Sequence, residues 1–237
     1  MTDNARPLAL VTGASSGIGA NLARELARDG HDLVLAARRI EPMRVLAEEL
    51  EAAGARCTII AADLSKSGAA AALVRELETQ GLSVDVLINN AGVSHFRLLD
   101  EQSPEAIDLA LAVNLQAPIH LCRLLLPHLR QQSSAHILNT GSVFGSIGYP
   151  AYAVYSATKF GMRGFSEALR RELGDSKVRV HYLAPRATRT DINSAEVEQM
   201  NAELGVAMDA VSTVAAAACR MLENEATETV VGWPEKL

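Results

Sequence analysis

Short apolar segments alternate with longer amphipathic segments along the chain, and this alternation limits the possible folds more than any other feature. Strands that alternate with helices form right-handed crossovers, which place parallel strands in one sheet covered by helices on both faces. We therefore predict an α/β fold with a doubly wound, seven-stranded, mainly parallel sheet. The predicted strands are 8–12, 32–37, 56–61, 84–89, 136–140, 179–183 and 229–231. The predicted helices are 18–29, 42–53, 69–80, 104–129, 153–173 and 210–223.

The whole chain is expected to form a single domain, 1–237, because no linker, repeat or block of like charge interrupts the pattern. Local residues agree with the predicted helix ends. Ser103 and Pro104 are a favourable cap and first helical residue. Glycines that suit helix termination stand at positions 30, 54, 81 and 174.

Composition excludes several classes of partner. The net charge is −6 and no basic stripe is present, which argues against nucleic acid. The N-terminal sequence MTDNARPLALVTG is too polar for a signal peptide, and we expect no membrane-spanning stretch. Cys57, Cys122 and Cys219 are scattered, without metal-ligand spacing, so we predict free thiols in a cytoplasmic protein and no metal site.

The segment 107–129 is apolar nearly all round, unlike an ordinary surface helix. We expect one of its faces to pack on the sheet and another to meet a second subunit, in a homodimer or homotetramer. The alternative is a helix buried entirely by its own domain.

A glycine-rich turn, TGASSGIG at residues 12–19, follows the first predicted strand and opens the first helix. Gly13 suits a tight turn, Gly17 a close backbone approach to a pyrophosphate, and Gly19 close packing of the helix on the sheet. The N-terminus of the helix offers N–H groups and a partial positive charge to an anion. The sequence therefore predicts a dinucleotide site, the alternative being a purely structural turn.

The second predicted strand ends at Arg38 and Arg39. An acidic residue here would bind the adenosine ribose hydroxyls, whereas guanidinium groups bind a 2′-phosphate. NADP(H) is therefore predicted in preference to NAD(H). The alternative is a solvated arginine pair at the start of a helix.

Tyr155 and Lys159 are four residues apart in the sequence YSATK, within a predicted helix, so their side chains share one face. A lysine cation one turn away favours the phenolate and should lower the pKa of the tyrosine. Tyr155 could then move a proton to or from a carbonyl oxygen, and Ser142, just past the fifth strand, could hydrogen-bond the same oxygen. The alternative is an ordinary surface pair.

Taken together, TGASSGIG, the sequence NNAG at 89–92, Ser142 and YSATK resemble the core group of the short-chain dehydrogenase/reductase family over nearly the whole chain. The resemblance implies a Rossmann-type fold. It also implies that Asn114 is a fourth catalytic residue, which holds a water near Lys159. The implied cofactor-binding residues, in addition to Tyr155 and Lys159, are Gly13, Ser15, Ser16, Gly17, Ile18, Gly19, Arg38, Arg39, Asp63, Leu64, Asn90, Ala91, Gly92, Pro185, Thr188 and Thr190.

The implied function is an NADP(H)-dependent oxidoreductase that interconverts a small-molecule carbonyl and a secondary alcohol by hydride transfer. Ser142 and Tyr155 would polarise the carbonyl, Tyr155 would give the proton, and Lys159 would orient the nicotinamide ribose. One alternative is a non-catalytic dinucleotide-sensing regulatory protein. Another is a sugar-nucleotide epimerase or dehydratase, which the glycine spacing and the short C-terminal portion disfavour.

The chain departs from the family pattern after the sixth strand, where it reads APRATRT at 184–190 with Arg186 in place of the usual glycine. Arg186 could bind an anionic substrate group, or it could be a surface arginine without a ligand. The following segment, 191–207, is predicted to be a substrate lid. Ser94–Phe96 and Val143–Tyr149 should shape a partly apolar pocket. His95 could assist a substrate or lie in an exposed loop.

Overall fold

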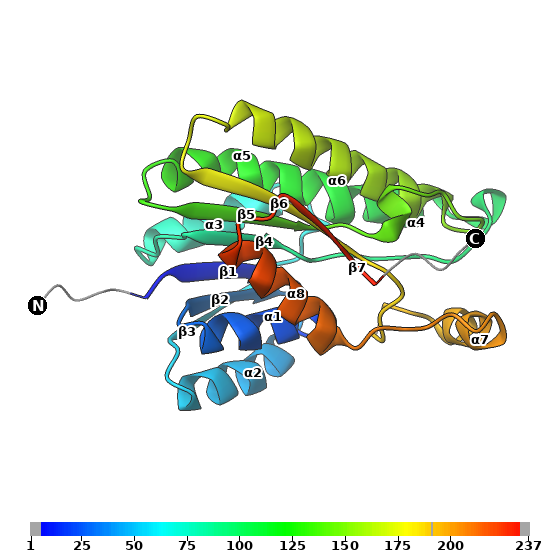
Figure 1. Ribbon diagram of the computed structural model, residues 1–237, viewed down its shortest axis with the longest axis horizontal. Helices are drawn as coiled ribbons and strands as arrows, with labels where there is room; N and C mark the ends of the chain where they lie inside the picture. The colour runs from blue at the N-terminus through cyan, green and yellow to red at the C-terminus, as the bar shows by residue number, and fades with distance from the viewer. Residues whose placement is uncertain (1–5, 191, 233–237) are drawn as a thin grey trace, which may run out of the picture.

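The computed structural model of the protein describes residues 6–190 and 192–232. Within them, one sheet has the strand order β3-β2-β1-β4-β5-β6-β7, and all neighbouring strands are parallel (Figure 1). This confirms the predicted fold class. The strands are β1 Leu8–Thr12, β2 Asp32–Ala37, β3 Cys57–Ala61, β4 Val86–Asn89, β5 Ala135–Thr140, β6 Val178–Pro185 and β7 Glu228–Val231.

Helices cover both faces of the sheet (Figure 1). On one face the core is closed by α1 (Gly17–Arg28), α2 (Ile40–Ala52) and α8 (Val211–Glu223). On the other face it is closed by α3 (Ala69–Thr79), α5 (Ala117–Leu129) and α6 (Ala153–Glu172). The central strands β1, β2 and β4 are buried on both faces, which explains why they read as continuous apolar runs.

The sixth strand is longer at its carboxyl end than the sequence analysis predicted. Ala184 and Pro185 pair with Val230 and Val231 of β7, and so continue the ladder up to the edge of the cavity described below. The proline is tolerated because it is the last residue of the strand, where a missing N–H costs little.

The predicted single helix 104–129 contains a wider turn. It comprises α4 (Pro104–Leu111), the π-helical segment η2 (Ala112–Gln116) and α5. Pro118 explains the change, because it has no N–H to offer to the carbonyl of Asn114 four residues earlier, and its ring would clash with that carbonyl in a regular α-helix. Widening to a π-turn keeps the helix continuous past this position.

By length and composition alone, the run Pro104–Leu129 is long and apolar enough to cross a membrane. In the structure 44% of its most apolar 18 residues is buried, and α5 packs on α3 while α4 packs on α6. Burial within the fold accounts for the apolar composition. The predicted contact with a second subunit stays a prediction, as does the cytoplasmic location.

Three further short elements lie in connections: η1 (Leu99–Glu101), η3 (Val143–Gly145) and α7 (Ala195–Glu203). The helix α7 was not predicted, and it stands apart from the two helical layers (Figure 1). The hydroxyl of Ser194 caps it by accepting a hydrogen bond from the backbone N–H of Val197. The predicted lid begins at Asp191, which lies outside the described residues, as do the first five residues of the chain.

Candidate active site

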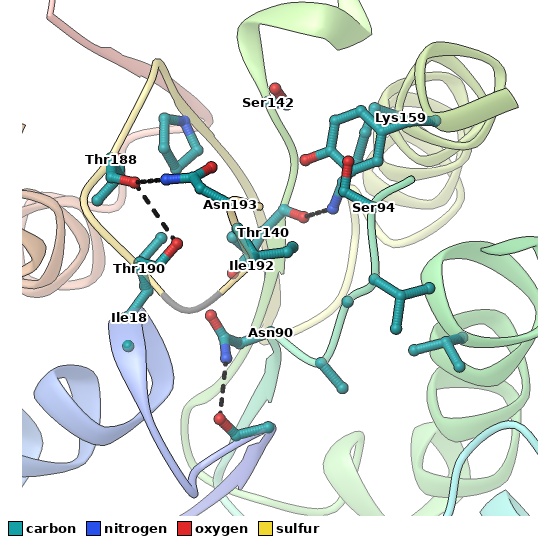
Figure 2. Close-up of a pocket in the computed structure, with 18 of the residues that line it drawn as sticks. Ile18, Asn90, Ser94, Thr140, Ser142, Lys159, Thr188, Thr190, Ile192 and Asn193 are labelled. Carbon is teal, nitrogen blue, oxygen red and sulfur yellow. Dashed lines mark hydrogen bonds between the residues drawn. The ribbon is translucent and has the colours of Figure 1, made fainter. Parts of the chain in front are cut away.

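A cavity of about 820 Å³ opens at the carboxyl ends of the strands, where the strand order reverses between β1 and β4 (Figure 2). Ligands of doubly wound sheets bind at such a position. Of the predicted site residues, only Gly19 and Asn114 do not line the cavity. The predicted residues that line it are Gly13, Ser15, Ser16, Gly17, Ile18, Arg38, Arg39, Asp63, Leu64, Asn90, Ala91, Gly92, Ser142, Tyr155, Lys159, Pro185, Thr188 and Thr190.

The glycines of the turn are required by backbone conformation and by close packing. Gly13 and Gly17 have φ angles of +68° and +57°, which side chains rarely allow. A Cβ on Gly13 would also lie 2.8 Å from the Cα of Ala91. A Cβ on Gly19 would overlap the carbonyl oxygen of Gly13, so this glycine acts through packing and not by lining the cavity.

Thr12 joins the two loops on either side of the strand reversal, a role that the sequence analysis missed. Its hydroxyl donates to the carbonyl of Ile88 and accepts hydrogen bonds from the backbone N–H groups of Asn90 and Ala91, at 3.0 and 3.1 Å. The side-chain amide of Asn90 donates back to the carbonyl of Thr12 at 3.1 Å. Three of these hydrogen bonds fix the NNAG loop against the glycine turn, and the fourth joins Thr12 to β4.

The N-terminus of α1 faces this turn without a side-chain cap, because Ser16 is extended and its hydroxyl does not bond the first turn. The first N–H groups of a helix without a cap remain available to an anion. The guanidinium of Arg39 reaches across, and its Nη2 donates to the hydroxyl of Ser16 at 2.7 Å and, more weakly, to that of Ser15 at 3.4 Å. A cation therefore lies beside the serines of the glycine turn.

Asp63 lies after β3, on the same side of the cavity as Arg38. Its carboxylate accepts hydrogen bonds from the hydroxyl and the backbone N–H of Ser65. The hydroxyl bond, together with the charges of Lys66 and Arg38, holds the pKa of Asp63 below its usual value. A carboxylate fixed in this way can accept hydrogen bonds from an adenine amine.

Ser142 follows β5 and is held by Tyr182, a residue that the sequence analysis did not single out. The phenol oxygen of Tyr182 lies 3.4 Å from the backbone N of Ser142, 3.3 Å from its carbonyl oxygen and 3.4 Å from the carbonyl oxygen of Lys159. Tyr182 is almost fully buried. It therefore links the loop of Ser142 to the helix that carries Tyr155 and Lys159.

Lys159 is 5% exposed, and its Nζ donates a 2.8 Å hydrogen bond to the carbonyl of Thr140 (Figure 2). The Nζ lies 5.5 Å from the centroid of the Tyr155 ring. One turn of α6 thus brings both groups into the cavity, as the spacing predicted.

The expected acidification of Tyr155 was wrong for the free protein. Burial raises the pKa of Tyr155 to about 12, although a hydrogen bond with Ser142 acts in the opposite direction. Burial also lowers the pKa of Lys159 to about 8. Removal of water from both side chains disfavours both charged forms, and sequence spacing carries no information on this desolvation.

Asn114 sits in the π-turn η2 and is 2% exposed. Its side chain exchanges two 2.8 Å hydrogen bonds with the backbone of Val93, and its amide also donates to the hydroxyl of Thr158 at 3.2 Å. It therefore fastens the loop after β4 to α6. The predicted role in holding a water is not tested by this geometry.

The sequence analysis left open whether Arg186 binds an anionic substrate group or is a surface arginine without a ligand, and the structure shows a third arrangement. Its guanidinium forms two parallel hydrogen bonds of 3.0 Å with the carboxylate of Asp209, and both side chains are largely buried. A Cβ on Gly232 would overlap this guanidinium, so the backbone covers it closely. Arg186 lines the cavity but is already paired.

We keep the name lid for residues 192–207, which include α7. An ion pair between Arg97, in the loop after β4, and Glu196 of α7 joins the lid to the body of the protein. At its start, the amide of Asn193 donates to the carbonyl of Thr188 at 2.8 Å (Figure 2). Ser94 and His95 line the cavity, and His95 is half-buried in the loop after β4 and not exposed.

Comparison with known proteins assigns the chain to a family. The sequence profile of the short chain dehydrogenase family matches residues 7–201. The 3-oxoacyl-[acyl-carrier-protein] reductase FabG of Staphylococcus aureus is 32% identical over 83% of this chain and 80% of its own length.

Solved structures of similar sequence have the same fold. The bulky-bulky ketone specific alcohol dehydrogenase of Comamonas testosteroni is 32% identical, with a TM-score of 0.85 over 97% of this chain and 87% of its own. A short chain dehydrogenase from Burkholderia cenocepacia in complex with NADP is 30% identical, with a TM-score of 0.85 over 95% and 96% of the two chains. One from Burkholderia phymatum in complex with NAD is 27% identical, with a TM-score of 0.87 over 98% and 90%. The chain therefore belongs to the short chain dehydrogenase family of oxidoreductases.

Proposed function

We propose that the protein is an NADP(H)-dependent reductase that converts a small-molecule ketone into a secondary alcohol and catalyses the reverse oxidation. The observation that carries this proposal is the placement of Ser142, Tyr155 and Lys159 in one cavity with the glycine turn of residues 12–19. A substrate in this cavity would therefore lie next to both a proton donor, Tyr155, and a bound dinucleotide.

The residues present fit a dinucleotide. Glycines with positive φ and the first turn of α1, which has no side-chain cap, form a cradle for a pyrophosphate. Asp63 and the loop of residues 90–92 would hold the adenosine half, while Pro185, Thr188 and Thr190 would hold the nicotinamide half. When bound, the cofactor supplies a hydride to the carbonyl carbon or, in the reverse direction, accepts one.

Tyr155 acts as the general acid in reduction. Its burial keeps the phenol protonated at neutral pH, which is the form that can give a proton to the carbonyl oxygen. The oxygen of Ser142 accepts a hydrogen bond from the backbone N–H of Phe144, so its own hydrogen can be donated to Tyr155 or to the substrate. The hydroxyls of Tyr155 and Ser142 can therefore both donate towards the carbonyl oxygen, on which negative charge develops during reduction.

Lys159 supports the loss of this proton. With a pKa of about 8 it is mainly a cation at neutral pH, and its charge stabilises the phenolate that forms as the proton leaves. The carbonyl of Thr140 holds the ammonium in place. Asn114 acts as a positioning residue, because it holds the Val93 backbone at the edge of the cavity.

The preference for NADP(H) rests on Arg39. Its guanidinium lies beside Ser15 and Ser16, and no acidic residue follows β2 directly. An anionic phosphate next to this cation would gain a charge-assisted hydrogen bond that the hydroxyl of NAD(H) cannot provide.

The function is tested by following the absorbance of NADPH with a panel of ketones. Tyr155→Phe should lower turnover by about 10²–10⁴-fold while NADPH still binds in calorimetry. Tyr149→Phe, which removes a phenol from the same cavity, should lose far less. Substantial turnover by Tyr155→Phe would overturn the assigned role. Binding of NADPH without reduction of any ketone would instead favour the dinucleotide-sensing alternative.

A further inference from the structure

One part of the cavity is lined by aromatic rings, which we call the aromatic wall: Phe144, Tyr149, Tyr152 and Tyr155. Phe144 is at its centre, with ring centroids 5.5 Å from Tyr149, 5.0 Å from Tyr152 and 6.4 Å from Tyr155. The sequence has only four tyrosines and four phenylalanines, so half of them gather here. Aromatic surfaces of this kind bind planar apolar groups in stacked or edge-to-face arrangements.

A second set of apolar side chains comes from the lid. Those that line the cavity are Ile192, Val197, Met200, Leu204 and Val206. Ile192 and Leu204 are 41% and 60% exposed, which is high for large apolar residues in a hollow of the surface. An apolar ligand that covers this surface removes it from water, which favours binding by roughly 25 cal/mol for each Å² buried.

The charged side chains near the aromatic wall and the lid already have hydrogen-bond partners within the protein. Among the described lining residues, Arg38, Arg39 and Asp63 follow β2 and β3, on the side of the glycine turn. The other two charged side chains are Lys159, bonded to the carbonyl of Thr140, and Arg186, bonded to Asp209. An anionic group placed against the aromatic wall and the lid would lose its water without gaining a new ion pair, which is costly.

From these observations, and resting on the proposed function, we infer that the substrate is an uncharged ketone with an aryl group on one side of the carbonyl and a bulky apolar group on the other. The aryl group belongs next to the carbonyl because Tyr155 is itself part of the aromatic wall, edge-on to Phe144 at 88°. The second group would lie beneath the lid. The reaction is ketone + NADPH + H⁺ to secondary alcohol + NADP⁺, with a new C–H bond at the carbonyl carbon and a new O–H bond to its oxygen.

The charge requirement is tested with two aryl ketones of similar shape, 4′-methylacetophenone and 4-acetylbenzoate. We expect kcat/KM to be at least about 100-fold higher for the neutral ketone, because the carboxylate must be desolvated without a partner. Equal or faster reduction of 4-acetylbenzoate, or a preference for a 3-oxoacyl thioester over all aryl ketones, would overturn the inference.

The size requirement is tested at the lid with Leu204→Ser. This variant should raise KM for isobutyrophenone by about 5-fold and leave KM for acetophenone nearly unchanged, since only the larger of these two phenyl ketones has a bulky group beneath the lid. Val45→Ser is the matched control, because Val45 is 68% exposed on α2 and does not line the cavity. The same loss for both ketones, or for both variants, would contradict contact between the substrate and Leu204.

Failure of the inference and failure of the proposed function are distinguished by calorimetry with two alcohols, 1-phenyl-1-propanol and 4-(1-hydroxyethyl)benzoate. Selective binding of the neutral alcohol, together with no reduction of any ketone, would overturn the proposed function and support the ligand class. Reduction of ketones with no selectivity between the neutral and anionic compounds would support the function and overturn the ligand class.

Discussion

A methyl group on Gly141 would overlap the phenol ring of Tyr182, so the loop that carries Ser142 can take its path only because position 141 has no side chain. Tyr182 fills that space from β6 and binds the loop through its hydroxyl. The position of a proposed catalytic serine therefore depends on a bulky residue of a neighbouring strand.

Gly141→Ala should lower the free energy of unfolding by about 1–3 kcal/mol, because the added methyl group overpacks a rigid contact. In a Tyr182→Ala background, which is itself destabilised, the same change should cost much less. Urea unfolding of the four proteins measures this coupling. Additive effects of the two substitutions would show that the residues do not compete for the same space.

Arg39→Ala should raise KM for NADPH by about 10–100-fold and leave KM for NADH nearly unchanged, because a charge-assisted hydrogen bond contributes roughly 1.5–3 kcal/mol. Arg44→Ala is the matched control, since Arg44 is an exposed arginine of α2 that pairs with Glu41 and does not line the cavity. An equal loss with both cofactors would assign Arg39 to general structure and not to the phosphate.

Arg186→Met should destabilise the protein by about 1.5–3 kcal/mol, because it leaves the carboxylate of Asp209, 13% exposed, without its two hydrogen bonds. Arg44→Met breaks an exposed pair and should cost no more than about 1 kcal/mol. Thermal or urea unfolding compares the two variants. A similar small effect for both would mean that the Arg186–Asp209 pair contributes little to stability.

Acid should destabilise the fold through two histidines, His136 near the amino end of β5 and His181 in the middle of β6. His136 Nδ1 and His181 Nε2 are 3.0 Å apart, and His181 Nδ1 bonds the carbonyl of Ala226. Burial lowers the pKa of His181 from 6.5 to about 4 and also lowers that of His136, against the opposing charge of Glu225. Arg170 and Arg179 face the pair and act in the same direction as burial.

Because the unfolded chain binds protons more readily than these buried rings, stability is complete above pH 6.5 and is lost as the pH falls towards 4. For His181 alone the loss at pH 5 is about 2 kcal/mol. His181→Gln should flatten the urea midpoint between pH 7 and pH 5, although it lowers stability at pH 7. An unchanged pH dependence in this variant would place the acid sensitivity elsewhere, with His31, whose pKa burial also lowers, as the next group to test.

The sheet and its layers could be predicted because they depend on local patterns. Continuous apolar runs such as Leu8–Thr12 indicate strands that are buried in the centre of a sheet. Glycines at 30, 54 and 81 indicate helix ends, and all three have positive φ in the structure. The cavity followed from the same information, since the carboxyl ends of parallel strands converge on one edge. Motif residues far apart in sequence therefore had to meet there.

Features that depend on tertiary contacts were missed. The pairing of Arg186 with Asp209 joins two loops, and nothing near either residue indicates the partner. The helix α7 lacks a marked apolar face, and its signals, the cap at Ser194 with Glu196 and Glu198 in the first turn, are weak ones. The pKa of Tyr155 depends on how much water the surrounding chain removes, which spacing alone does not determine.

The backbone is joined across the base of the lid, where Thr188 and Asp209 form a parallel bridge and the N–H of Arg189 donates to the carbonyl of Asp209. An insertion between these points has its ends already held together, and each doubling of such a loop costs only about 0.6 kcal/mol. Evolution or a protein engineer can therefore exchange this segment for a longer or shorter one while the sheet and the glycine turn stay as they are. The part of the cavity that the lid lines can then change while the glycine turn and Arg39 keep their places.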